Sequence, residues 1–201
     1  MKKELITFAL IMIFLQPKLF GQNILLNGNF EDQSSGCKNP KDNAPEDFDL
    51  EPFYDNKVGN WNSSHGTAQI THTRCNNTTF DNLVYNGNSS AFMSWSTGNK
   101  EGIYHPISIK KDESFNISFV ARGWNDSSKI IIKFTSGIQN NHSQVLPSPA
   151  NSQTLFEISL TANWQEFSLD EVIANANYSQ IWIYAENGLG IFLDDLAIYK
   201  S

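Results

Sequence analysis

Segments in which apolar and polar residues alternate dominate the second half of the chain. A period of two is typical of β-strands with one buried face and one exposed face. The expected inward-facing residues are Phe115, Ile117, Phe119 and Ala121, then Ile130, Ile132 and Phe134, then Phe156, Ile158 and Leu160, and last Ile181, Ile183 and Ala185. Turn-forming residues separate these segments, and the closest approach to a helix is a single turn expected at residues 170–176. The pattern predicts an all-β protein, an antiparallel β-sandwich.

The first 21 residues have the pattern of a secretory signal peptide. Lys2 and Lys3 precede an apolar run from Leu5 to Leu15, and Gly21 offers a small residue at a cleavage point. The run is too short to span a bilayer. We therefore expect export to the periplasm, the cell surface or the medium, no membrane insertion, and a single domain over residues 22–201.

The next region, residues 32–60, is polar and irregular and contains Pro40, Pro45 and Pro52. Just before it, Ile24-Leu25-Leu26 has the apolar character of a strand. We therefore expect the region to be a long loop within the domain rather than a linker between domains.

Charge and cysteine content bear on which partners the chain can bind and on whether it carries a disulfide. The chain has 201 residues, of which 40% are hydrophobic, and a net charge of −7. The acidic balance argues against nucleic acids and anionic membrane surfaces as partners, because these require basic patches. Cys37 and Cys75 are the only cysteines. We expect them to form a disulfide in an exported chain, the alternative being two buried free thiols.

Four segments together resemble one family. The opening residues 23–31 (NILLNGNFE) and closing residues 191–199 (IFLDDLAIY) resemble the "N-L-x-x-N-G-x-F-E" and "I-D-D-V" strands of carbohydrate-binding modules with a galactose-binding-like jelly-roll fold. Between them, residues 115–122 (FNISFVAR) and 163–168 (NWQEFS) resemble the family's central strand and its tryptophan-containing strand. Gly59-Asn60-Trp61, Gly66-Thr67 and Cys75 also resemble small exported Bacteroidetes proteins with the same opening.

The resemblance implies a jelly-roll β-sandwich whose first and last strands lie close together. It also implies a structural calcium ion held by carboxylates from both strands, here Glu31 and Asp194. Calcium takes six to eight oxygen ligands, which carboxylates and backbone carbonyls can supply. The alternative is that Glu31 and Asp194 are solvated residues at strand ends.

Aromatic residues outside the core are the candidates for glycan recognition. Trp164 and Trp61 are expected to pack. By alternation, Trp182 and Tyr184 share the outer face of their strand, and Arg122 lies on the outer face of another. If these outer faces belong to one sheet, the three side chains form a candidate binding site, with Trp95 and Trp124 at its margin. The alternative is that the 32–60 loop covers this face and the aromatic side chains pack beneath it.

No motif indicates catalysis. The four histidines show no HExxH spacing, and there is no GxSxG motif and no glycine-rich phosphate loop. Asp194 and Asp195 are adjacent, and adjacent strand residues point to opposite faces, so they are not expected to act as a pair. His65 with His72 and Arg74 is the one polar cluster that could line a cleft.

The sequence therefore predicts an exported, non-catalytic protein that binds a glycan on an aromatic-lined sheet face. The alternative is a structural or adhesive surface protein that uses the same face to bind a protein partner and has no sugar ligand. Neither the sugar nor the oligomeric state follows from the sequence.

Overall fold

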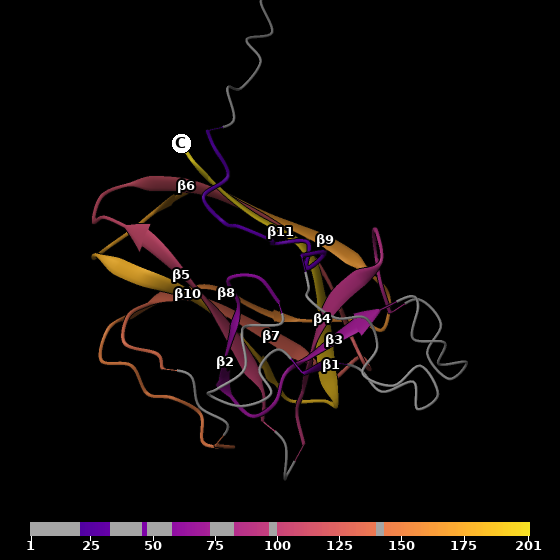
Figure 1. Ribbon diagram of the computed structural model, residues 1–201. Coiled ribbons are helices and arrows are strands. Elements are labelled where there is room, and N and C mark those ends of the chain that lie inside the picture. Colours follow the sequence, from indigo (N-terminus) through magenta and orange to yellow (C-terminus); the bar gives the residue numbers. More distant parts are fainter. Residues whose placement is uncertain (1–20, 33–45, 48–57, 73–82, 97–99, 140–142) are drawn as a thin grey trace, which may run out of the picture.

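The described part of the chain forms two antiparallel sheets packed face to face. In the computed structural model it comprises residues 21–32, 46–47, 58–72, 83–96, 100–139 and 143–201 (Figure 1). The strands are β1 Glu46–Asp47, β2 Asn62–His65, β3 Gln69–His72, β4 Ser89–Ser94, β5 Gly102–Ile109, β6 Ser114–Gly123, β7 Lys129–Thr135, β8 Ser152–Ser159, β9 Gln165–Ile173, β10 Tyr178–Glu186 and β11 Gly190–Lys200. The predicted β-sandwich is confirmed.

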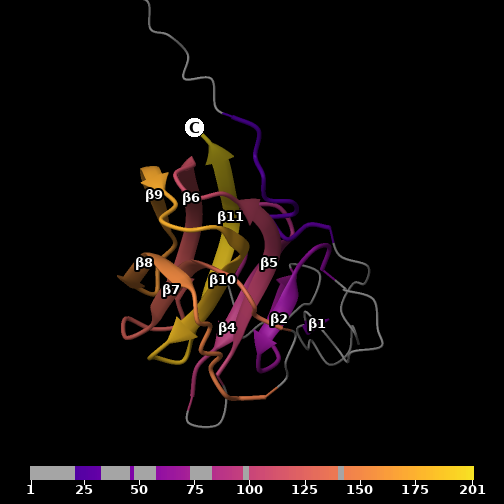
Figure 2. The same cartoon turned by 90° about the vertical axis from the view of Figure 1, so that its left-hand side faces the viewer.

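The two sheets differ in size and share one interior. The six-stranded sheet has the order β1-β3-β4-β11-β6-β9, and the five-stranded sheet has the order β2-β5-β10-β7-β8. Figure 2 looks onto the five-stranded sheet, with β6, β9 and β11 behind it. From β4 to β7, and again from β8 to β11, successive strands alternate between the sheets. This connectivity is that of a jelly roll.

The core lies between the sheets and is built from the inward positions that alternation predicts. Ile117 and Phe119 reach it from the six-stranded sheet, and Ile132, Phe134 and Ile183 reach it from the five-stranded sheet. All five are at most 1% exposed. The Phe119 ring also meets the ring of Phe156, on the opposite sheet, edge-on at a centroid distance of 4.8 Å, a geometry that adds to the stabilisation from burial.

Two local predictions are wrong. The strand expected at Ile24-Leu25-Leu26 is reduced to a single bridge between Asn23 and Tyr199 of β11. The chain turns away soon afterwards, with a positive φ of 52° at Asn27. The helical turn expected at residues 170–176 is instead the end of β9, because β9 continues its pairing with β6 as far as Ile173. The expected proximity of the chain's opening segment and β11 is nevertheless present.

Several predictions fall wholly or mostly outside the described residues. The signal peptide up to residue 20, Cys37 and Cys75 lie there, so the signal peptide and the disulfide remain predictions. Within the expected 32–60 loop, the structure describes Asp32, the short strand β1, which pairs with β3, and residues 58–60. The described part contains no helix long and apolar enough to cross a membrane.

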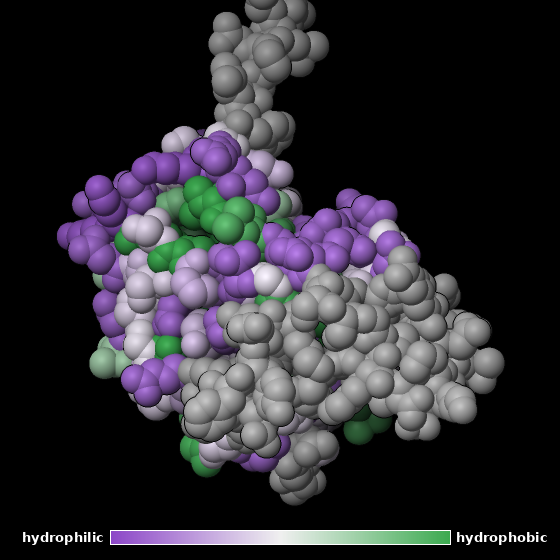
Figure 3. Space-filling model, viewed as in Figure 1, coloured by the Kyte–Doolittle hydropathy of each residue, from purple (hydrophilic) through white to green (hydrophobic). Residues whose placement is uncertain are grey.

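In the view of Figure 3, apolar residues gather in a small patch framed by hydrophilic ones, over the opening segment and the neighbouring strands. Leu26 of that segment is 58% exposed. Small apolar patches of this kind are normal on the surfaces of folded proteins.

Candidate functional site

The predicted binding residues lie on two opposite sides of the sandwich. Trp182 and Tyr184 belong to β10 and face outward from the five-stranded sheet. Arg122 belongs to β6 and lies on the outer side of the six-stranded sheet, beside Phe192 of β11. The expectation that these three share one face is therefore wrong. Alternation correctly gives the outward positions, but the two strands belong to different sheets.

The aromatic residues on the five-stranded sheet are covered. Trp182 is 1% exposed and Tyr184 is 4% exposed. Their rings form a separate apolar cluster with Tyr104 and Ile131, and Ile138 and Leu146, which follow β7, pack against it. This agrees with the alternative that the aromatic side chains pack beneath a cover. The described cover comes from the segment after β7 rather than from residues 32–60.

Beneath this cover, hydrogen bonds connect the side chains of Trp182, Ser64 and His65. Trp182 Nε1 donates to Ser64 Oγ at 2.9 Å, and Ser64 Oγ lies 2.8 Å from His65 Nδ1. Ser64 and His65 are both fully buried, and burial, with the nearby charge of Lys100, lowers the pKa of His65 to about 4. A serine and histidine pair without solvent access and with so weak a base does not resemble a catalytic dyad. His65 therefore does not line an open cleft, whereas the side chain of His72 and all of Arg74 lie outside the described residues.

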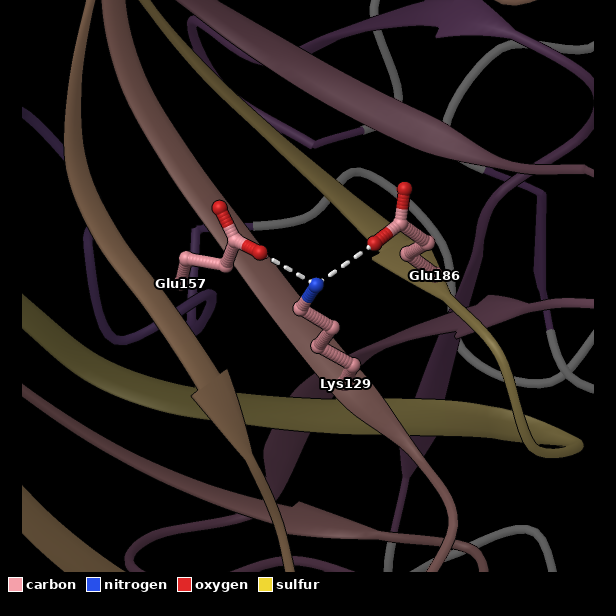
Figure 4. Close-up of polar contacts among 3 residues, drawn as sticks. All are labelled: Lys129, Glu157 and Glu186. Atoms are coloured by element: carbon pink, nitrogen blue, oxygen red, sulfur yellow. Dashed lines mark hydrogen bonds and ion pairs between the residues drawn. The ribbon is translucent and has the colours of Figure 1, made fainter.

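Further along the same outer face, charges pair across three strands. Lys129 of β7 contacts Glu157 of β8 and lies 2.9 Å from Glu186 of β10 (Figure 4). The two carboxylates hold the pKa of Lys129 above its usual range, with the Glu157 contact the larger cause. The five-stranded face thus presents covered rings and paired charges.

The outer face of the six-stranded sheet carries a second aromatic group, which we call the aromatic platform. Its members are Tyr85, Phe92, Trp124, Trp164 and Phe192.

The register of the sheet places these rings together. Phe92 of β4 and Arg122 of β6 are the Cα partners of Phe192 on its two sides. The rings of Phe92 and Phe192 stack at 4.8 Å, and Trp124, just after β6, stacks on Phe192 at 5.9 Å with an interplanar angle of 19°. Trp164, just before β9, reaches Phe192 at 6.5 Å. The platform therefore runs across four strands, from β4 to the start of β9.

The platform is open to solvent at its edges. Phe192, at its centre, is 1% exposed and forms its floor. Phe92, Trp124 and Trp164 are half-buried, and Tyr85 is 43% exposed. Partly exposed rings beside one another offer flat apolar surface to a ligand.

Of the predicted binding residues, Arg122 and Trp124 belong to this surface. The Arg122 guanidinium carbon lies 5.5 Å from the centroid of the Phe192 ring. Trp95, by contrast, packs against the main core cluster and has Lys100 Nζ 5.1 Å from its ring centroid, so it does not flank the platform. Trp164, expected only to pack, is partly exposed and belongs to the platform.

A loop over residues 83–88 forms one wall of the platform. The Tyr85 ring lies 5.7 Å from the Trp164 ring at an interplanar angle of 55°, and its hydroxyl donates to Glu166 Oε1 at 2.7 Å. This hydrogen bond raises the pKa of Tyr85. Beneath the loop, Asp194 is fully buried on β11, and burial raises the pKa of its carboxyl to about 7 although three backbone N–H groups donate to it.

The two carboxylates expected to hold calcium both bind this loop. Asp194 accepts hydrogen bonds from the backbone N–H groups of Tyr85 and Asn86, and Glu31 accepts them from those of Asn88 and Ser89. In this arrangement Asp194 Oδ2 and Glu31 Oε1 are hydrogen-bonded to backbone donors of the loop, and calcium, which takes six to eight oxygen ligands, would need further oxygen atoms beside them. No group of three or more acidic, histidine or cysteine side chains suited to a metal occurs among the described residues. Calcium binding remains a prediction from the resemblance.

The expectation that Asp194 and Asp195 point to opposite faces is also wrong in detail. The pairing of β11 with β6 shifts register between Asp194 and Ala197, and Asp195 has a positive φ of 47°. Such a bulge interrupts the alternation of side chains. As a result both carboxylates reach Asn86, Asp194 through the backbone N–H and Asp195 through the side-chain amide at 3.3 Å.

Phe92 and Phe192 are difficult to identify from the sequence. Each stands between two apolar residues that face the core, in Ala91-Phe92-Met93 and Ile191-Phe192-Leu193. An uninterrupted apolar run does not show which residue faces outward. Tyr85 lies in a polar loop, where no periodicity marks it.

Comparison with known proteins finds similarity of structure only. No protein-family model matches the sequence, and no curated protein matches it. The fold is similar to that of a family 61 carbohydrate-binding module in complex with β-1,4-galactotriose, at 12% identity and a TM-score of 0.49, over 90% of this chain and 100% of that one.

Two further solved structures are similar to this chain. One is the CBM22-1 xylan-binding domain of Xyn10C from Paenibacillus barcinonensis, at 15% identity and a TM-score of 0.43, over 79% of this chain and 93% of that one. The other is the K2 cleaved adhesin domain of Lys-gingipain, at 8% identity and a TM-score of 0.48, over 72% of this chain and 91% of that one. These are similarities of fold, and the ligands in those structures belong to those proteins. In its architecture the chain is an antiparallel β-sandwich.

Proposed function

We propose that this chain is an exported, non-catalytic protein that binds a glycan on the aromatic platform of the six-stranded sheet. The observation that supports the proposal is the group of partly exposed rings around Phe192, with the rings of Trp124 and Trp164 both in contact with it. Flat rings stack on the C–H faces of sugars, and polar groups at their margin supply hydrogen bonds to hydroxyls. Arg122, Glu166 and the Tyr85 hydroxyl stand at that margin.

The length of the platform favours an oligosaccharide over a single sugar. Neighbouring strands lie about 4.8 Å apart, so the distance from β4 to the start of β9 is about 14 Å. A surface of this length accommodates more than one sugar ring. The ligand is expected to lie across the strands, parallel to the row formed by Phe92, Phe192 and Arg122.

The test is a glycan-array screen of residues 22–201, followed by calorimetric titration with the best glycan. Trp124→Ala and Trp164→Ala should each weaken binding by roughly thirtyfold, the effect of losing about 2 kcal/mol at a well-packed aromatic contact. Trp95→Ala is the matched control, because Trp95 is also half-buried but packs toward the core. It should leave the affinity unchanged.

A folded protein that binds no glycan on the array would contradict the proposal. The remaining candidate would then be a structural or adhesive protein that uses the same rings to bind a protein partner. Equal losses of affinity in all three tryptophan variants would show that the effect comes from general destabilisation and not from the platform.

A further inference from the structure

The loop that carries Tyr85 is held by two carboxylates from opposite ends of the chain. Asp194 Oδ2 accepts hydrogen bonds from the backbone N–H groups of Tyr85 at 3.3 Å and of Asn86 at 3.1 Å. Glu31 Oε1 accepts them from Asn88 at 2.6 Å and Ser89 at 2.8 Å. Four backbone donors within five residues are thus satisfied by two side chains.

Asp194 is the more informative of the two because it is fully buried. Burying a carboxylate is costly unless hydrogen bonds replace its lost water. The hydrogen bonds that Asp194 makes go to the loop and to the backbone N–H of Asp195, 2.8 Å from Oδ1. The buried carboxylate therefore acts on the surface loop. Its role is to be found in the side chains that this loop holds in place.

What the loop positions is the outer wall of the platform. Tyr85 lies tilted against Trp164 and is tied to Glu166 of β9 by its hydroxyl. The two rings form a corner, a shape that suits contact with one face and one edge of a sugar ring, whereas the rings of Phe92 and Phe192 form a flat surface. The corner exists only while the backbone at Tyr85 is held down onto β11.

We propose that Asp194 is a positioning residue for the glycan site, which fixes Tyr85 against Trp164 through the backbone N–H groups of Tyr85 and Asn86. The inference rests on the proposed function. Tyr85 is then the residue that contacts the ligand, and Asp194 acts through it without touching the sugar.

The test compares Asp194→Leu with Asp194→Asn. Leucine fills the space but accepts no hydrogen bond, so amide hydrogen exchange at Tyr85 and Asn86 should be about tenfold faster or more, and glycan affinity should fall by a similar factor. Asparagine keeps one acceptor oxygen and should restore most of the protection and most of the affinity. A purely structural role would lower the melting temperature without such a rescue of affinity.

Two further variants complete the design. Tyr85→Ala removes an exposed ring, so it should fold normally, lose affinity and leave exchange at Asn88 and Ser89 unchanged. Glu113→Gln is the matched control, because Glu113 also accepts a backbone hydrogen bond, from Lys110, at the far end of β6. It should change neither the affinity nor exchange in the 83–88 loop.

The outcomes separate the two proposals. If the wild-type chain binds no glycan, the proposed function fails, and exchange at Tyr85 and Asn86 alone reports whether Asp194 holds the loop. If glycan binding is normal in Asp194→Leu while exchange is faster, or is normal in Tyr85→Ala, the positioning role is overturned and the proposed function stands.

Discussion

The two outer faces of the sandwich carry similar side chains with different surroundings. On the five-stranded sheet, Lys133 lies 5.6 Å from the ring centroid of Trp182, and the rings are sealed beneath Ile138 and Leu146. On the six-stranded sheet, Arg122 lies 5.5 Å from the ring centroid of Phe192, and the neighbouring rings remain partly exposed. The comparison shows that an aromatic ring with a cation over it does not define a binding surface. The segment that crosses the face decides whether the rings stabilise the fold or meet a ligand.

The largest expected effect is the contrast between Trp182→Ala and Trp124→Ala. Removing the buried indole leaves a cavity and takes away the N–H that donates to Ser64 Oγ, so the free energy of unfolding should fall by about 3–5 kcal/mol. Trp124 is only partly exposed, and its removal should cost about 1 kcal/mol while weakening glycan binding. Urea denaturation together with glycan titration measures both. If Trp182→Ala were as stable as the wild type but unable to bind glycan, the binding site would lie on the five-stranded sheet instead.

Calcium tests the role of Glu31 and Asp194, the two carboxylates that bind the 83–88 loop. If the ion predicted from the resemblance binds only the folded chain, the melting temperature in millimolar calcium should exceed that in excess chelator. The gain is about 2.7 kcal/mol at a free concentration of roughly one hundred times the dissociation constant. Equal melting temperatures would contradict the calcium prediction and leave Glu31 and Asp194 with the loop alone.

Because His65 is buried beneath the covered face of the five-stranded sheet, the free energy of unfolding should depend on pH. Its pKa falls from 6.5 in the unfolded chain to about 4 in the folded one. Between these values the unfolded chain binds more protons, so the stabilising effect is present above pH 6.5 and is lost as the pH falls toward 4. Between pH 7 and pH 5 the loss from this group is about 2 kcal/mol.

His65→Gln removes the titrating ring and should reduce this loss. Denaturation curves of both proteins at the two pH values measure the difference. The same loss in both proteins would show that His65 is protonated as easily in the folded chain as in the unfolded one.

The smallest effect is expected at the paired charges. Lys129→Gln breaks both contacts with Glu157 and Glu186 on the solvent side of the five-stranded sheet. Exposed ion pairs contribute little to stability and are screened by salt. The melting temperature should drop slightly at low salt and be unchanged at high salt. Glycan affinity should be unaffected, and a clear loss would place part of the binding surface on this face.

Much of the fold was predictable because burial leaves a period of two in the sequence. The runs at Phe115, Ile130 and Ile181 gave both the strands and their inward positions, which the core confirms. β9 was predicted only in part, because its pattern is weak where it lies at the edge of the sheet and most of its side chains are exposed.

The candidate site was predictable only in pieces. Arg122 and Trp124 were named for the right reason, since both lie outside the core, but they were grouped with Trp182 of the other sheet. Phe92 and Phe192 were hidden in apolar runs, and Tyr85 depends on a loop held by Asp194.

The sequence by itself determined that the chain forms short strands and which side of each strand faces the interior. That information is local, because each residue's preference for burial is set by its own side chain. The tertiary structure alone decided which strands share a sheet, which outer face is covered, and where the bulge at Asp195 brings two carboxylates onto one loop. Both outer faces alternate against the same core, so in sequence they look alike until the strands are assembled.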